Sequence, residues 1–85
     1  MKILYHSKFL KQYKRLDNFI QDLAEEREII FRDNPFDSRL KTHKLSGRFE
    51  GYYAFSVNYS YRIIFNFVGE NTVKFFQVGT HNIYE

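Results

Sequence analysis

The spacing of apolar residues changes near Leu40, and this change constrains the fold more than any other feature of the chain. Before it, apolar side chains such as Phe9, Tyr13 and Leu16 recur at the period of an amphipathic helix. After it, larger and smaller side chains alternate over residues 53–59, which is the period of a strand. Helices followed by strands are typical of an α+β fold.

The first part of the chain predicts a short strand and a helical hairpin. Ile3-Leu4-Tyr5 is a short apolar run at the start. Ser7 precedes the first helical pattern and is expected to be its N-cap, and His6 before it is expected to be a loop or capping residue. Asp17 or Asn18 can cap a second helix. Asn34-Pro35 ends that helix, because proline disfavours helical geometry in the residue before it.

The second part predicts a run of strands separated by turns. Ser46-Gly47 and Gly69-Glu70-Asn71 are the turn signals, the second of them typical of a tight hairpin. Strands are predicted at residues 52–59, 61–67 and 73–78, with a turn at Asn58 to Ser60 that leads into the second of them, and residues 39–45 are predicted as a short strand or extended segment. We therefore expect the order β-α-α-β-β-β, with a curved, mainly antiparallel sheet and the helical hairpin packed on one face.

Length and composition bound the remaining possibilities. A chain of 85 residues makes a single domain, residues 1–85, and buries only about 60% of its unfolded surface. Ten Phe and seven Tyr supply an unusually aromatic core. The absence of Cys excludes a disulfide scaffold and a thiolate metal site. Without a long apolar stretch or a signal peptide, the protein is expected to be cytoplasmic and not bound to a membrane.

The charge distribution favours a polyanionic partner. The net charge is +3, and basic residues concentrate in the first helix and in the middle of the chain. Basic patches interleaved with aromatic residues are compatible with RNA or DNA binding. The candidate RNA-binding residues are Lys41, Lys44, Arg48 and Lys74.

The most informative candidates for chemistry follow the last predicted strand. His81 and Tyr84 stand three residues apart just after Gly79, and both side chains can exchange protons. His43 is a further candidate from the middle of the chain. Three scattered His residues without a nearby carboxylate pattern make a poor metal site, and no nucleotide-cofactor motif is present. We therefore expect no metal and no cofactor.

Arg62 is the second point of interest, because large apolar residues flank it in a predicted strand. An unpaired buried charge is costly, so its guanidinium needs a partner. That partner is either a carboxylate, such as Glu50 or Glu70, or a phosphate group, which the guanidinium matches bidentately.

Together, Arg62, His81, Tyr84 and His43 are suited to cleaving RNA without a metal ion. A base removes the proton from a 2′-OH, and the resulting oxygen attacks the adjacent phosphorus. A cation stabilises the extra charge on the phosphoryl oxygens, and an acid protonates the leaving 5′-oxygen. Only RNA carries the required 2′-OH.

Three local signatures stand out along the chain. His43-Lys44-Leu45-Ser46-Gly47 has the form H-x-L-x-G, Tyr61-Arg62-Ile63-Ile64-Phe65 has the form Y-R-[LI]-[VI]-[YF], and Val78-Gly79-Thr80-His81, followed by Tyr84, contains G-T-H. In this order they resemble the RelE/ParE superfamily of toxins from type II toxin–antitoxin systems, nearest to the YafQ and RelE-type mRNA interferases. The first is similar to a segment of YafQ-like toxins, the second to a strand of the superfamily and the third to its ending.

The resemblance implies a function and partners. Such toxins are endoribonucleases that cleave mRNA in the ribosome, are silenced by a cognate antitoxin, and often bind operator DNA together with that antitoxin. Arg62 matches the strand arginine that acts on the scissile phosphate. His81 matches a terminal acid or base, Tyr84 a terminal aromatic residue, and His43 an upstream histidine.

The chain also departs from its relatives. Ser56 and Ser60 stand where YafQ-like toxins carry His and Asp, and Tyr53 and Phe55 stand where RelE-like toxins place lysines. Serine is no general base at neutral pH, so His81 or His43 would have to take that role. Two alternatives therefore stay open: a ParE-like inhibitor of DNA gyrase without hydrolytic activity, and an inactivated relative that still binds an antitoxin.

Overall fold

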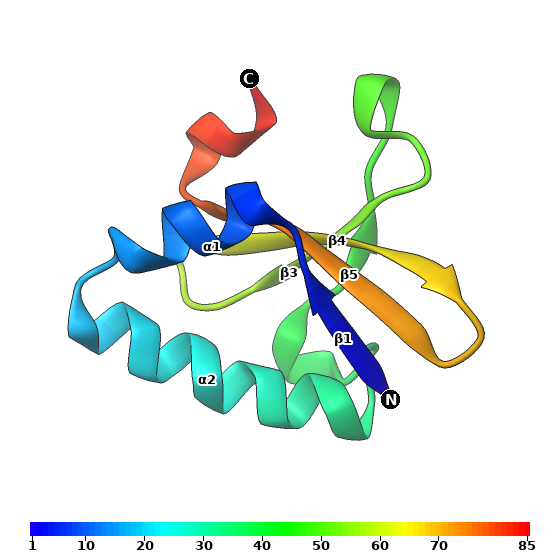
Figure 1. The fold of residues 1–85 in the computed structure, drawn as a ribbon, viewed down its shortest axis with the longest axis horizontal. Coiled ribbons are helices and arrows are strands. Elements are labelled where there is room, and N and C mark those ends of the chain that lie inside the picture. The colour runs from blue at the N-terminus through cyan, green and yellow to red at the C-terminus, as the bar shows by residue number, and fades with distance from the viewer.

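The computed structural model describes all residues, 1–85, and contains two helices and a five-stranded sheet (Figure 1). Three short 3₁₀ turns, η1 to η3, complete it. In chain order the elements are β1 (Lys2–Tyr5), α1 (Ser7–Lys14), α2 (Asn18–Asp33), η1 (Ser38–Leu40), β2 (His43–Lys44), η2 (Gly47–Phe49), β3 (Tyr53–Ser56), β4 (Arg62–Gly69), β5 (Thr72–Gly79) and η3 (His81–Tyr84).

The sheet is mixed and open, with the strand order β1-β5-β4-β3-β2. The first strand lies parallel to β5, and every other neighbouring pair is antiparallel. The predicted α+β class and the mainly antiparallel sheet are therefore confirmed. The turn at residues 69–71 joins β4 to β5 as the predicted hairpin, with Asn71 in the left-handed backbone region (φ 53°).

Side-chain capping begins both helices. The N-cap of α1 is His6, predicted as a loop or capping residue, and not Ser7, because the His6 Nδ1 accepts the backbone N–H of Lys8 at 3.0 Å. Asp17 caps α2 as predicted and accepts the N–H of Ile20 at 3.0 Å.

No helix is sufficiently long and apolar to span a membrane.

Aromatic side chains form the main core, between the two helices and one face of the sheet. Phe31 of α2 lies at its centre, and its ring centroid is 5.0 Å from that of Phe55, 4.9 Å from that of Phe65 and 5.3 Å from that of Phe75. All four side chains are fully buried. Because α1 and α2 both contribute to this cluster, they cover the same face of the sheet (Figure 1).

A smaller cluster on the other side of the sheet anchors the last residues of the chain. Ile83 of η3 packs there against Ala54 of β3 and Ile64 of β4, and all three are buried. Partly buried aromatic residues from η2 and β5 surround them, including Phe49 and Phe76. The C-terminal segment is thus part of the packed structure.

Two predicted strands are shorter than expected, and local hydrogen bonds explain both differences. Residues 39–45 form η1 and the two-residue β2, because the Asp37 side chain accepts the N–H of Arg39 and starts a turn. The strand predicted at 52–59 begins at Tyr53 and ends at Ser56. The Asn58 side chain accepts the N–H groups of residues 60 and 61 there and bends the chain.

The aromatic core makes a testable prediction about stability. Phe31→Leu should lower the free energy of unfolding by about 1–2 kcal/mol, because it removes volume from a fully buried position. Phe19→Leu is the matched control on the same helix, since the Phe19 side chain is 71% exposed. It should change stability by less than about 0.5 kcal/mol. Urea denaturation measures both, and equal effects would contradict the assigned core.

Candidate active site

An open groove of about 690 Å³ lies where β4 begins and β5 ends. Four of its lining residues are the predicted catalytic residues, which come from β2, β4 and the C-terminal turn η3. The full lining is His43, Tyr59, Ser60, Arg62, Thr80, His81 and Tyr84. The fold therefore brings all four candidates to one concave surface, and their catalytic role remains a prediction.

The hairpin of β4 and β5 explains why distant positions meet. Arg62, the first residue of β4, pairs in register with Gly79, the last residue of β5. The chain turns immediately afterwards into η3, which carries His81 and Tyr84. His43 comes from β2, an edge strand that is separated from β4 by β3.

The Arg62 guanidinium has no carboxylate partner. Its Nη1 donates to the backbone carbonyls of Asn58 at 2.7 Å, Tyr59 at 3.1 Å and Tyr61 at 3.1 Å. The ion pairs of the structure are Arg32–Glu28 and Arg39–Asp37, so neither Glu50 nor Glu70 pairs with Arg62. Neutral carbonyls hold the guanidinium in place without cancelling its charge, which leaves it suited to bind a phosphate.

The Ile83 side chain lies close to the backbone of Gly79, and this contact holds η3 against the sheet. A Cβ added at Gly79 would lie 2.6 Å from Cγ2 of Ile83, so only glycine leaves room for the turn to fold back. Arg48 of η2 adds a contact, because its Nη2 donates to the Tyr84 carbonyl at 3.4 Å. The ring of Phe49 lies edge-on to that of Tyr84, with centroids 6.5 Å apart. These contacts position the last two candidate residues.

Tyr84 is half-buried, and its phenol stays protonated at neutral pH. Burial raises the pKa of Tyr84 above its usual value of 10.0, while the nearby Arg62 cation acts in the opposite direction. The ring centroids of Tyr84 and His81 are 6.0 Å apart. The groove therefore combines a neutral hydroxyl donor, an imidazole and a guanidinium.

A backbone hydrogen bond selects the tautomer of His43. Its Nδ1 lies 3.1 Å from the carbonyl oxygen of Lys41. A carbonyl oxygen can only accept, so Nδ1 carries the proton, and Nε2 of the neutral ring is left unprotonated. An exposed imidazole in this state can accept a proton from a substrate.

None of the four predicted RNA-binding residues lines the groove itself. Lys41 lines an adjoining pocket, whereas Arg48 lies on η2 and stacks over the Phe49 ring at 5.2 Å. Lys44 on β2 and Lys74 on β5 line neither the groove nor that pocket. Nothing in their contacts assigns them a role, so RNA binding by these residues stays a prediction.

Tyr59 lines the groove, and residue types alone did not indicate it. The residue is 97% exposed and belongs to the alternating pattern over residues 52–59, but β3 ends earlier, at Ser56. Asn58 and Ser60 on either side are turn-forming residues, and the turn that they predict is confirmed. Ser60 also lines the groove, while Ser56 lines the adjoining pocket.

No three His, Cys, Asp or Glu side chains converge as a metal site.

Comparison with known proteins identifies the family. Residues 1–84 match the sequence profile described as "Bacterial toxin of type II toxin-antitoxin system, YafQ". The chain belongs to the YafQ family of type II toxins. This confirms the resemblance to the RelE/ParE superfamily that the three sequence signatures indicated. No curated protein matches the chain in sequence.

Several solved structures share the fold of this chain. The YoeB/ParE toxin from Agrobacterium tumefaciens has a TM-score of 0.81 at 19% identity, covering 95% of this chain and 99% of that one. YafQ from E. coli has a TM-score of 0.77 at 20% identity, covering 98% and 96%. The E. coli DinJ–YafQ complex matches with a TM-score of 0.68 at 22% identity, covering 96% and 94%. At these identities the likeness concerns the fold.

The close approach at Gly79 predicts that a single methyl group disturbs the site. Gly79→Ala should displace η3 and lower the free energy of unfolding by about 1–3 kcal/mol, because the new Cβ overlaps Ile83. Amide chemical shifts of residues 80–85 should change with it. Gly69→Ala is the control, since its Cβ would meet only Thr72, at 3.9 Å. Unchanged shifts in Gly79→Ala would contradict the packing of η3.

Proposed function

We propose that this YafQ-family toxin is an endoribonuclease that cleaves mRNA by attack of the 2′-OH on the adjacent phosphate. One observation carries the proposal: two imidazoles, a phenol and a guanidinium without a carboxylate partner line a single groove. Ribonuclease activity is typical of the family. An arrangement that only had to bind a protein would not require this set of groups.

In the proposed reaction, His43 replaces the strand His and Asp of other family members as the general base. Its unprotonated Nε2 removes the 2′-OH proton. The 2′-oxygen then forms a bond to phosphorus while the bond from phosphorus to the 5′-oxygen breaks. His81 protonates that leaving oxygen, and the products are a 2′,3′-cyclic phosphate and a 5′-hydroxyl. Every proton passes through a side chain, so the proposed reaction does not require a metal ion.

Arg62 and Tyr84 stabilise the charge that develops on the phosphoryl oxygens. The guanidinium of Arg62 keeps N–H donors free, since only Nη1 bonds to backbone carbonyls. The protonated Tyr84 hydroxyl supplies a further neutral donor. Donors already in place for a developing anion are among the strongest contributions to catalysis.

The proposal includes partners. A cognate antitoxin should silence the toxin, as the DinJ–YafQ and YoeB–YefM complexes pair a toxin of this fold with a second protein. A basic surface favours an acidic, partly disordered antitoxin segment that folds on contact. The mRNA would be presented by the ribosome, and operator DNA would be bound only by the toxin–antitoxin complex.

Substitution of each histidine by asparagine tests the proposal. Induced in a bacterium, the wild type should arrest growth and produce new mRNA 5′ ends. His43→Asn and His81→Asn should each lower the rate of cleavage by about 10²–10⁴-fold, since each removes a proton-transfer group. Mapping of mRNA 5′ ends measures the effect.

His6→Asn is the matched control. His6 lines no part of the groove, and asparagine preserves the N-cap of α1. This variant should therefore remain as toxic as the wild type. Full toxicity of His81→Asn, or an equal loss in His6→Asn, would count against the proposed reaction.

The raised pKa of Tyr84 predicts how the rate depends on pH. Because burial raises the pKa of Tyr84 above its usual value of 10.0, this phenol does not titrate between pH 5 and 9 and should contribute no limb to the pH–rate profile in that range. Tyr84→Phe should lower the rate by about 10–100-fold at every pH, because one donor to a charged group is lost. Single-turnover cleavage of a short RNA measures this, and a shifted alkaline limb would contradict it.

A further inference from the structure

A second basic pocket adjoins the groove and shares two of its residues. It has a volume of about 370 Å³ and meets the groove at Tyr59 and Arg62. Four of its residues are cationic and none is acidic. The lining is Arg27, Arg39, Lys41, Ser56, Val57, Asn58, Tyr59 and Arg62. A concave site with this charge is suited to an anion.

One loop holds two of these cations. The Nε of Arg27, on α2, donates to the carbonyl of Val57 at 3.1 Å. Arg62 donates to carbonyls of the same loop, at Asn58, Tyr59 and Tyr61. Both guanidiniums are partly buried, and both rest on neutral acceptors, so their positive charges stay unmatched. Their remaining N–H donors are available to a ligand.

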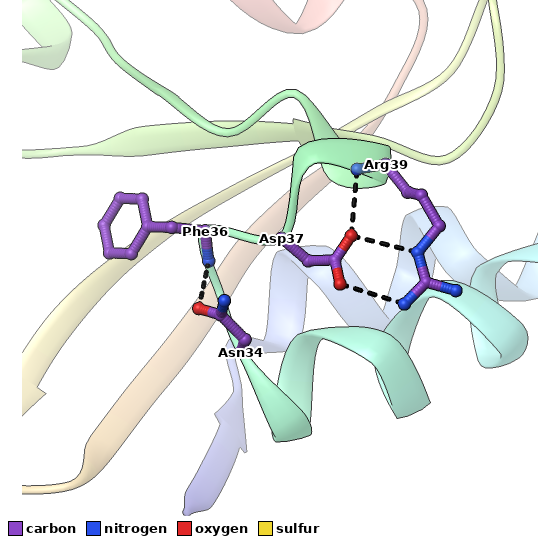
Figure 2. Close-up of polar contacts among 4 residues, drawn as sticks. All are labelled: Asn34, Phe36, Asp37 and Arg39. Carbon is purple, nitrogen blue, oxygen red and sulfur yellow. Dashed lines mark hydrogen bonds and ion pairs between the residues drawn. The ribbon is translucent and has the colours of Figure 1, made fainter.

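The segment after α2 supplies the other two cations. The Arg39 guanidinium donates to both carboxylate oxygens of Asp37 at 2.9 Å (Figure 2), and this bonding holds the pKa of Asp37 at about 2. Arg39 therefore brings little net charge. Lys41 follows in the left-handed backbone region (φ 54°), which is unusual for a residue other than glycine. Its ammonium group makes no ion pair.

Tyr59 stands between the pocket and the groove. Its side chain is almost fully exposed and makes no hydrogen bond, so it contributes little to the stability of the fold. Its backbone carbonyl, in contrast, accepts from Arg62 and so places the residue beside the scissile-phosphate site. An exposed aromatic ring between two cationic sites has the arrangement used to bind single-stranded nucleic acids.

We propose that this pocket binds the RNA phosphate next to the scissile one, with the base between the two phosphates stacked on Tyr59. The inference rests on the proposed function, because the groove around Arg62 is taken as the site of cleavage. The ligand is thus at least two phosphates of single-stranded RNA. Arg27 and Lys41 supply the main charge at the second phosphate.

Binding of 2′-O-methyl RNA, which cannot be cleaved, tests the inference with the purified full-length toxin. A dinucleotide carries one phosphate and a trinucleotide carries two. The wild type should bind the trinucleotide about tenfold more tightly than the dinucleotide, as measured by calorimetry. Arg27→Gln should remove that advantage. For this variant, the plot of log binding constant against log salt concentration should also be shallower by about 0.7 for the trinucleotide, because one phosphate contact is lost.

Arg32→Gln is the matched control on the same helix, since Arg32 lines neither the pocket nor the groove. It should keep the full advantage of the trinucleotide. Lys41→Gln, which disturbs no side-chain hydrogen bond, should behave like Arg27→Gln and serves if that variant fails to fold. Tyr59→Ala should weaken trinucleotide binding about tenfold, and Tyr59→Phe should restore it, because stacking needs only the ring.

The results separate this inference from the proposed function. If the trinucleotide has no advantage in the wild type, or if Arg27→Gln and Lys41→Gln both match Arg32→Gln, the second phosphate site is wrong. If cleavage is absent but the length-dependent binding and its loss are observed, the pocket stands as an RNA site and the proposed reaction fails. If cleavage is observed but neither Arg27→Gln nor Lys41→Gln removes the advantage of the trinucleotide, the proposed reaction stands and the second phosphate site is wrong.

Discussion

The antiparallel pairing of β4 with β5 is the interaction on which the rest of the structure depends. It places Arg62 opposite Gly79, and it carries Phe65 and Phe75 into the aromatic core beneath the helices. The same hairpin places His81 and Tyr84 at the groove, because η3 begins directly after β5. Packing of Phe31 from α2 stabilises this pairing, so the core and the site depend on one arrangement.

The electrostatics of the groove and the adjoining pocket follow from how their cations are held. Backbone carbonyls of the loop after β3 fix Arg27 and Arg62, whereas carboxylates engage Arg32 and Arg39. No buried side-chain polar atom is left without a partner. The fold thus satisfies the hydrogen-bonding needs of these arginines while leaving their charge exposed to a ligand, which is the condition for binding a phosphate backbone.

Strong periodicity made most of the fold predictable, and local side-chain hydrogen bonds caused the errors. The helical pattern that ends at Asn34-Pro35 and the hairpin at Gly69 depend on nearby residues, and both were predicted. The choice of His6 over Ser7 as the N-cap of α1 and the early end of β3 before the Asn58 turn were not settled by the sequence, because several side chains compete for the same backbone groups. In the site, residue types nominated Arg62 and the histidines, but no pattern connected Arg27 with a loop thirty positions away.

By itself the sequence determined the fold class, the family and the chemical groups available for a reaction, because these depend on periodicity and on motifs that are local in the chain. Only the tertiary structure decided that Arg62 has no carboxylate partner, that a carbonyl sets the tautomer of His43, and that Tyr59 lies between two cationic sites. Each of these depends on which segments pack together. That choice is made by the burial of the aromatic core, to which residues throughout the chain contribute.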